Sequence, residues 1–197
     1  MGRAHYLLLM DMLTADEGMM AVKMARNTIE AVVRGRPVPS TSLPPVFSEK
    51  RGVFVTITSS GELRGCIGYP YPVLPLREAV PSAATGAALE DPRFPPVHLS
   101  ELDRIRVEVT VLTPPEPLDV TPDMRPHAVI IGKHGLIARS GGRSGLLLPQ
   151  VATEYSWSCE EFLSHTCMKS GLPPNCWKQS ETEILTFEGQ IFHEQGS

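Results

Sequence analysis

The sequence predicts one soluble α+β domain, and three patterns lead to this prediction. Residues 14–33 place apolar side chains at helical spacing. Residues 52–69 contain two apolar, β-branched runs on either side of a Ser-Ser-Gly turn. Residues 105–112 alternate between apolar and polar side chains, as a half-buried strand does. The 197 residues are enough for one sizeable core, or for two small lobes that share it.

The composition is that of a globular protein and argues against several classes. Hydrophobic residues make up 42% of the chain and charged residues 20%. The net charge is −4 and no block of lysine and arginine occurs, so we do not expect a nucleic-acid binder. No apolar run reaches membrane-spanning length. Asp11 interrupts the apolar run near the start and no cleavage site follows, so residues 1–12 are expected to be a helix cap or a frayed end.

Four cysteines occur in the chain: Cys66, Cys159, Cys167 and Cys176. None of them forms a C-x-x-C pair, and no cluster has the spacing of a zinc site. Because a secretion signal is missing, we expect a cytoplasmic protein with reduced thiols. Cys159, Cys167 and Cys176 are most simply packing residues, and the first two lie two turns apart on one predicted helix.

The first half of the chain carries clear start and turn signals. Thr14 and Glu17 form a capping box, and the turn that ends at Gly61 joins two strands into a hairpin. Pro81 lies within an alanine-rich helical pattern and indicates a kink or a late start. The expected elements are a helix at 14–33, strands at 52–58 and 63–69, a helix at 74–89 and a strand at 105–112.

The second half is expected to repeat this kind of arrangement. Its expected elements are strands at 128–131, 135–139 and 146–148, a helix that begins after Ser158 and ends at Gly171, and a last strand or hairpin at 184–192. Residues 52–68 and 135–148 each run glycine, apolar strand, Ser/Gly turn, arginine, glycine and apolar strand, and each leads into a helix. This likeness suggests an internal duplication.

The second strand of the first hairpin has an unusual combination of side chains. Because side chains alternate along a strand, Glu62, Arg64 and Cys66 are expected to share one face. The other face, Leu63, Gly65, Ile67 and Tyr69, is expected to meet the core. A cation near a thiol favours the thiolate, which is the nucleophilic form. Alternatively, Cys66 is a small buried apolar residue and Arg64 pairs with Glu62 on the surface.

Glycines and a stiff loop supply further candidate residues. Gly65 and Gly68 weaken a strand interior, and such glycines often mark close approach by a ligand or another backbone, or a bulge. Asp91 and Arg93 flank Pro92 in a rigid loop. Arg93 could bind a carboxylate or phosphate, but we favour a structural role in which it pairs with Asp91 or a backbone carbonyl.

His134 is the remaining candidate for proton transfer. It lies in a predicted turn, and if the two hairpins are related by duplication it could approach Cys66 as a general base. The simpler alternative is a solvent-exposed turn histidine. The six histidines are scattered and no Walker or Rossmann loop occurs, so we expect neither a metal nor a nucleotide cofactor.

Several motifs, in order along the chain, resemble the AMMECR family, which is named for a human disease region that includes Alport syndrome and elliptocytosis. Leu63-Arg64-Gly65-Cys66-Ile67-Gly68 matches the hallmark motif of that family in full. The likeness continues in Asp91-Pro92-Arg93-Phe94, Val111-Leu112-Thr113-Pro114, Gly132-Lys133-His134-Gly135-Leu136, Leu148-Pro149-Gln150-Val151-Ala152, Trp157 with Glu161-Phe162-Leu163, and Cys167-Met168-Lys169-Ser170-Gly171-Leu172. Ser170 stands where the family usually has alanine.

The resemblance covers residues 14–194, which we take as a single AMMECR-type domain that could be built of two lobes. Residues 1–13 are then an N-terminal extension. It implies two strand-and-helix repeats that share one barrel-like, mainly antiparallel sheet with helices packed outside. It implies no settled activity. Prokaryotic relatives are found with, or fused to, Memo-type dioxygenase-like proteins and radical SAM proteins, so the resemblance implies either such a partner or a shared pathway.

Two functions remain open from the sequence. The first is an enzyme that acts through Cys66, where Arg64 favours the thiolate or holds an anionic substrate and Glu62 or His134 moves protons. The second is an adaptor or binding domain, in which the same face recognises a protein or a small metabolite without turnover.

Overall fold

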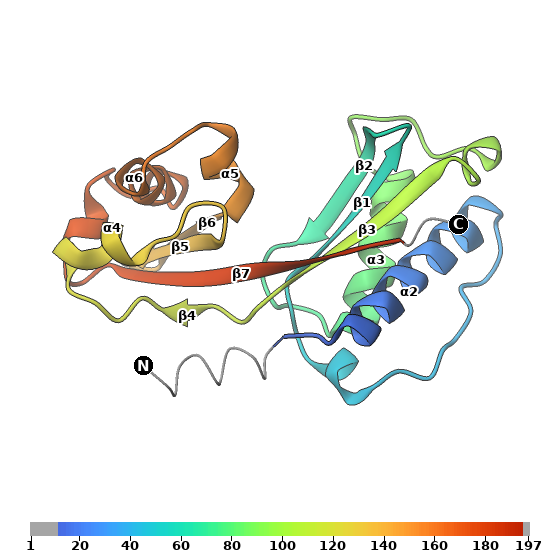
Figure 1. Cartoon of the computed structure of the whole chain (residues 1–197), viewed down its shortest axis with the longest axis horizontal. Helices are drawn as coiled ribbons and strands as arrows, with labels where there is room; N and C mark the ends of the chain where they lie inside the picture. The colour runs from blue at the N-terminus through green and yellow to red at the C-terminus, as the bar shows by residue number, and fades with distance from the viewer. Residues whose placement is uncertain (1–11, 195–197) are drawn as a thin grey trace. The chain divides into compact units, whose positions relative to one another are not determined.

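The structure, a computed structural model, describes residues 12–194 (Figure 1). Its α-helices are α2 (Ala15–Val33), α3 (Leu76–Leu89), α4 (Arg125–Ala128), α5 (Pro149–Glu154) and α6 (Cys159–Lys169). Its strands are β1 (Val53–Ser59), β2 (Glu62–Tyr69), β3 (Ile105–Leu112), β4 (Glu116–Pro117), β5 (His134–Ser140), β6 (Arg143–Leu147) and β7 (Glu183–His193). Short 3₁₀ helices are η1 (Pro45–Ser48), η2 (Leu99–Glu101), η3 (Pro122–Met124) and η4 (Cys176–Lys178). The expectation for the first residues of the chain falls, up to residue 11, outside the described part.

The chain divides into two compact units. Among the described residues, the first comprises 12–112 together with 190–194, and the second comprises 113–189. Strand β7 belongs to both, because its residues 183–189 lie in the second unit and its residues 190–193 in the first. The mixture of helices with antiparallel strands confirms the predicted α+β class.

The first unit is built on the strand order β2-β1-β3, with antiparallel pairing throughout. Val53, Val55 and Ile57 of β1 are fully buried and belong to one core with α2 and α3. Five of the eight buried residues of α3 are alanine and a sixth is glycine, which lets the helix backbone lie close to the strands. The capping box of Thr14 and Glu17 at the start of α2 is confirmed.

Local backbone conformation explains the turn of the first hairpin and bears on the start of α3, the helix that contains Pro81. Ser60 and Gly61 both have positive φ, 53° and 85°, as the two central residues of a tight hairpin turn require. Pro81 lies inside α3, which already begins at Leu76. The alternative of a late helix start at Pro81 is therefore wrong.

The second unit has the strand order β6-β5-β7, with β4 paired to β7. Leu136, Phe162 and Leu163 are fully buried in its core, and the capping box at Ser158 that opens α6 is confirmed. The strand predicted at 128–131 is wrong. The Ile130 carbonyl accepts hydrogen bonds from Lys133 and His134, so the β-branched run bends into a turn instead of pairing.

The predicted internal duplication agrees with the arrangement inside each unit. Both units run hairpin, helix and strand, with the first hairpin strand in the middle of the order. Gly65 of β2 and Gly145 of β6 occupy matching places in this scheme. A Cβ at Gly65 would collide with the Ala87 carbonyl of α3, and a Cβ at Gly145 with the Lys169 carbonyl of α6. In both units glycine lets the last turn of a helix touch the strand.

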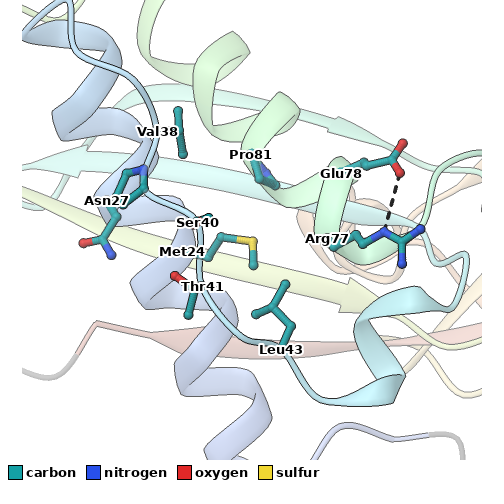
Figure 2. Close-up of a pocket in the computed structure, with 10 residues that line it drawn as sticks. Met24, Asn27, Val38, Ser40, Thr41, Leu43, Arg77, Glu78 and Pro81 are labelled. Carbon is teal, nitrogen blue, oxygen red and sulfur yellow. Dashed lines mark ion pairs between the residues drawn. The ribbon is translucent and has the colours of Figure 1, made fainter.

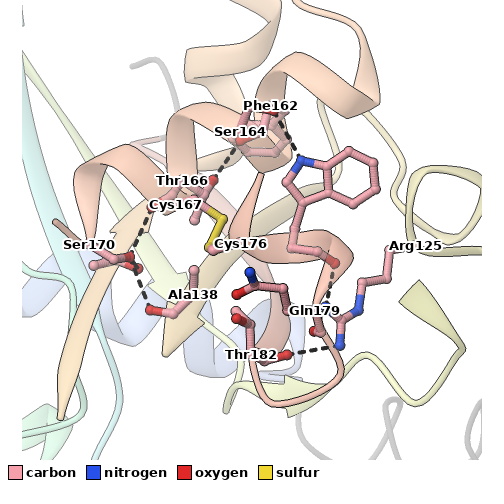
Figure 3. The surroundings of a disulfide bond; sticks show 12 residues. Arg125, Ala138, Phe162, Ser164, Thr166, Cys167, Ser170, Cys176, Gln179 and Thr182 are labelled. Carbon is pink, nitrogen blue, oxygen red and sulfur yellow. Dashed lines mark hydrogen bonds between the residues drawn. A yellow bond between two sulfur atoms is a disulfide. The ribbon is translucent and has the colours of Figure 1, made fainter. Parts of the chain in front are cut away.

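A disulfide joins Cys167 of α6 to Cys176 of η4 in the second unit (Figure 3). The expectation of reduced thiols at these two positions is therefore wrong, although both side chains are packed as expected, with exposures of 0% and 1%. Hydrogen bonds from the buried Arg125 also fix the segment after Cys176. The Arg125 guanidinium donates to the carbonyls of Trp177 and Thr182 at 2.5 and 2.8 Å.

We expect the disulfide to stabilise the native state by about 2–3 kcal/mol, because it closes a short loop in the unfolded chain. Urea unfolding of the oxidised protein and of the Cys167→Ala/Cys176→Ala variant would measure this difference. Dithiothreitol should lower the free energy of unfolding of the wild type and leave that of the double variant unchanged. Equal stability of all four samples would contradict the prediction.

Candidate functional site

Cys66 lies in the middle of β2, an edge strand of the first unit, directly opposite Thr56 of β1. Its side chain is half-buried, and the Thr56 hydroxyl donates to Cys66 Sγ at 3.4 Å. The main chain of Cys66 is held by the loop after α3. Its N–H donates to Asp91 Oδ2 at 2.8 Å, and its carbonyl accepts from Arg93 Nη2 at 3.2 Å. These two bonds occupy the positions that a further strand would use at a sheet edge.

Asp91 and Arg93 form a rigid clip on this edge. Asp91 Oδ1 accepts from the Arg93 main-chain N–H at 3.1 Å and from Arg93 Nε at 3.0 Å, while Oδ2 accepts from Nη2 at 2.7 Å. The bonds from Arg93 are the main cause that holds the pKa of Asp91 well below its usual range. Asp91 in turn is the main cause of the raised pKa of Arg93, and Cys66 adds to it. The expected structural pairing is thus present.

The clip leaves a cation partly open beside the thiol. The Asp91 side chain is 2% exposed, whereas that of Arg93 is 53% exposed. Arg93 Nη1 makes no hydrogen bond within the described residues, so this donor is open to solvent or to a ligand. A fixed guanidinium with a free donor is suited to bind a carboxylate or phosphate.

Arg64 has a different partner from the one predicted. Its Nε and Nη2 donate to Oε1 and Oε2 of Glu101 at 2.8 and 3.1 Å, and Nη2 also reaches the Pro96 carbonyl at 3.3 Å. The bond from Arg64 is the main cause of the lowered pKa of Glu101. The guanidinium of Arg64 lies 6.0 Å from the centre of the Phe94 ring, and that of Arg93 lies 5.5 Å from it. Both arginines are therefore tied to the loop after α3.

A bulge in β2 changes which side chains share a face. The register shifts between Ile57 and Thr58, so that Leu63 pairs with Thr58 and Glu62 pairs with Ser59. Cross-strand partners project to the same side of a sheet. Leu63 therefore lies on the Thr56 side with Cys66 and is 42% exposed, while Glu62 lies on the opposite side. The sequence expectation that Glu62 joins Cys66 on one face, and that Leu63 meets the core, is corrected by this bulge.

Both motif glycines are explained by packing inside the first unit. A Cβ at Gly65 would collide with the Ala87 carbonyl, and one at Gly68 with the Val53 carbonyl. The close approach that the sequence predicts is thus made by the chain's own backbone. A binding role for Gly65 and Gly68 stays a prediction with no contact to support it.

His134 belongs to the second unit, at the start of β5. Its Nδ1 accepts from the Ile130 N–H at 3.2 Å, so the neutral ring carries its proton on Nε2. Burial lowers the pKa of His134, although Glu188 acts in the opposite direction. It is half-buried and not the exposed turn histidine of the simpler alternative. Its role as a base for Cys66 stays a prediction.

Two residues of this site were not identified from the sequence. Thr56 could have been found by pairing the hairpin strands, because it lies directly across from Cys66. Glu101 is 37 residues from Arg64 in the sequence, and such a distance gives no local pattern. Cys159 is the other free cysteine and donates to the Val129 carbonyl at 3.5 Å.

Two searches of residues 12–194 concern metals and membranes. No group of three or more His, Cys, Asp and Glu side chains among them is arranged to hold a metal ion. In the same range, no helix has both the length and the apolar character needed to cross a bilayer.

Comparison with known sequences decides the family. The profile of the AMMECR1 family matches residues 22–192. The chain belongs to the AMMECR1 family. A relative from Methanothermobacter thermautotrophicus, named "Protein", is 55% identical over 188 residues, which cover 93% of this chain and 97% of the relative. Protein MJ0810 of Methanocaldococcus jannaschii is 50% identical over 188 residues, which cover 94% of both chains.

A solved structure is also similar to this AMMECR1-family chain. It is the crystal structure titled as that of the uncharacterized protein PH0010 from Pyrococcus horikoshii. The two chains share 46% sequence identity with a TM-score of 0.75, and the match covers 93% of this chain and 94% of the other. The two chains therefore share one fold.

We expect Asp91→Asn to lower the free energy of unfolding by about 1–3 kcal/mol, because the amide can accept fewer of the bonds that Asp91 receives. The lowered pKa of Asp91 means that its contribution is present above the ordinary aspartate range and is lost as pH falls. Urea unfolding at several pH values should give a constant difference between the two proteins above about pH 5 and a shrinking one below about pH 4. A pH-independent difference would show that the charge of Asp91 does not matter.

Proposed function

We propose that Cys66 is the reactive group of a small-molecule site on the edge of β2, as a nucleophile or as a substrate-binding thiol. Arg93 holds the negative charge of the substrate. The observation that carries this proposal is the half-exposed Arg93 side chain, fixed on the Cys66 carbonyl at 3.2 Å by the buried Asp91. The Thr56 hydroxyl donates a hydrogen bond to the same sulfur, and such a bond would stabilise a thiolate.

The chemical class follows from the charges at the site. Arg64 is bound bidentately by Glu101, and its Nη1 is buried with no partner among the described residues. The open donor of Arg93 instead belongs to a side chain that is 53% exposed. A small electrophile that bears a carboxylate or phosphate near its reacting carbon would meet Arg93 and Cys66 together. Glu62 lies on the other side of the strand and receives no role. We also propose that the protein works in the cytoplasm, where Cys66 and Cys159 stay reduced and the buried Cys167–Cys176 disulfide would have to persist in a reducing compartment. Cell fractionation would test this.

We expect Cys66 to react faster with iodoacetamide at pH 7 than Cys159, the other free and half-buried thiol. Time-resolved peptide mapping by mass spectrometry would give both rates within one sample. Cys159 is the internal control, because it faces a backbone carbonyl instead of an arginine. Equal rates, or a protected Cys66, would count against a reactive thiol.

A second reagent tests the role of Arg93 by itself. The rate with anionic iodoacetate is divided by the rate with neutral iodoacetamide, so that the fraction of thiolate cancels. We expect this ratio to be higher at Cys66 than at Cys159, and to fall at least about threefold in Arg93→Gln. The exposed Arg36→Gln is the matched control and should leave the ratio unchanged. An unaltered ratio in Arg93→Gln would remove Arg93 from the proposal.

A second candidate is an adaptor role with a Memo-type or radical SAM protein as partner. The bulge favours it, because Leu63 is turned outward beside Cys66 and is 42% exposed. We expect Leu63→Asp to weaken co-purification with such a partner at least about tenfold, since a buried charge would oppose docking. Met20→Asp is the control, because Met20 is also 42% exposed but lies on α2. An equal loss of co-purification in both variants, or no loss in either, would argue against docking at this face.

A further inference from the structure

A hollow of about 300 Å³ lies inside the first unit and is lined by none of the residues that hold Cys66 (Figure 2). It is open to solvent on one side and is bordered by α2, by α3 and by the loop that leads from α2 to η1. Its volume is at the lower end of the range for small-molecule pockets. Met24, Val38, Leu43 and Pro81 supply apolar surface from all three segments.

One end of this hollow carries a positive and a negative charge side by side. Arg77 Nε lies 3.6 Å from Glu78 Oε1, and the two side chains are 52% and 55% exposed. Figure 2 shows this pair on one side of the apolar residues and Asn27 on the other. Within the described residues, Arg77 Nη2 and Glu78 Oε2 have no bonding partner, while Arg77 Nη1 donates to Ser48 Oγ at 3.0 Å. The pair therefore keeps one free donor and one free acceptor.

Pro81 adds an acceptor at the same end. Proline has no N–H, so the carbonyl of Arg77, four residues earlier in α3, lacks its usual helical donor. Arg77 and Pro81 both line the hollow, one helical turn apart on α3. A helix that accepts a proline at this position leaves a backbone oxygen for another donor.

We propose that this hollow binds a free α-amino acid with an apolar side chain. The α-carboxylate pairs with Arg77, and the α-ammonium pairs with Glu78 and the Arg77 carbonyl. The side chain lies among Met24, Val38 and Leu43. A simple anion would meet Glu78, a simple cation would meet Arg77, and an uncharged ligand would desolvate both without replacement. A zwitterion beside an apolar group satisfies each of these groups at once.

Calorimetric titration and thermal shift with L-leucine and L-methionine test this proposal. We expect saturable binding of both amino acids. Leucinamide lacks the carboxylate and N-acetyl-leucine lacks the ammonium, so each should bind at least about tenfold more weakly than leucine. No saturable binding of leucine or methionine up to about 10 mM would overturn the proposal. Equal affinity for leucine and its two derivatives would overturn the zwitterion assignment.

Variants locate the binding in the hollow. Arg77→Gln and Glu78→Gln should each weaken leucine binding about tenfold, and Val38→Trp should abolish it by filling the space. The matched controls are Val73→Trp, at an exposed valine outside the hollow, and Arg139→Gln, from an exposed ion pair of the second unit. Both should bind leucine like the wild type. Circular dichroism checks folding, and the two charge variants carry the test if Val38→Trp is unfolded. Leucine binding that survives all three hollow variants would overturn the proposal.

Discussion

The bond between Asp91 and the main chain of Cys66 is the contact on which the candidate site depends. It joins an edge strand to the loop that follows α3, and it fixes three groups at once: the strand, the carboxylate and the arginine. Because Asp91 is buried, its charge needs both the Cys66 N–H and the Arg93 guanidinium to offset desolvation. The same bond that covers the strand edge therefore places a cation beside the thiol.

The tight contacts of α3 explain why this loop reaches β2 at all. Alanines on the buried side of α3 and the missing Cβ of Gly65 let the helix lie directly on the strand. The chain leaves α3 after Leu89, and Asp91 follows two residues later, so the short connection delivers the carboxylate to the neighbouring edge. Packing and chemistry are thus linked, because a side chain at Gly65 would move the helix and with it the clip.

The two proposed sites of the first unit use charge in different ways. At Cys66, the carboxylate of Asp91 is buried by its arginine and leaves only the cation open to solvent. At the hollow beside α2, both members of the Arg77–Glu78 pair are exposed and neither is fixed by a bidentate bond. The first arrangement is suited to an anion and the second to a molecule that carries both charges. In the second unit, by contrast, the buried Arg125 donates from Nη1 and Nη2 to backbone carbonyls, its Nε has no partner among the described residues, and burial lowers its pKa.

The sequence by itself determined the elements whose signals are local. The capping boxes at Thr14 and Ser158, the Ser60-Gly61 turn and the alternation in β3 act over a few residues, so their outcome can be read from neighbours in the chain. Asp91 and Arg93 were paired correctly for the same reason. Tertiary structure decided the rest. The choice of Glu101 as the partner of Arg64 depends on where segments 37 residues apart meet. The bulge that moves Glu62 away from Cys66 and the joining of Cys167 to Cys176 span short stretches of chain, but both depend on how those stretches pack and leave no pattern in the sequence. Strand alternation cannot anticipate an extra residue, and charge pairing cannot be assigned before the loop that brings the partner is folded.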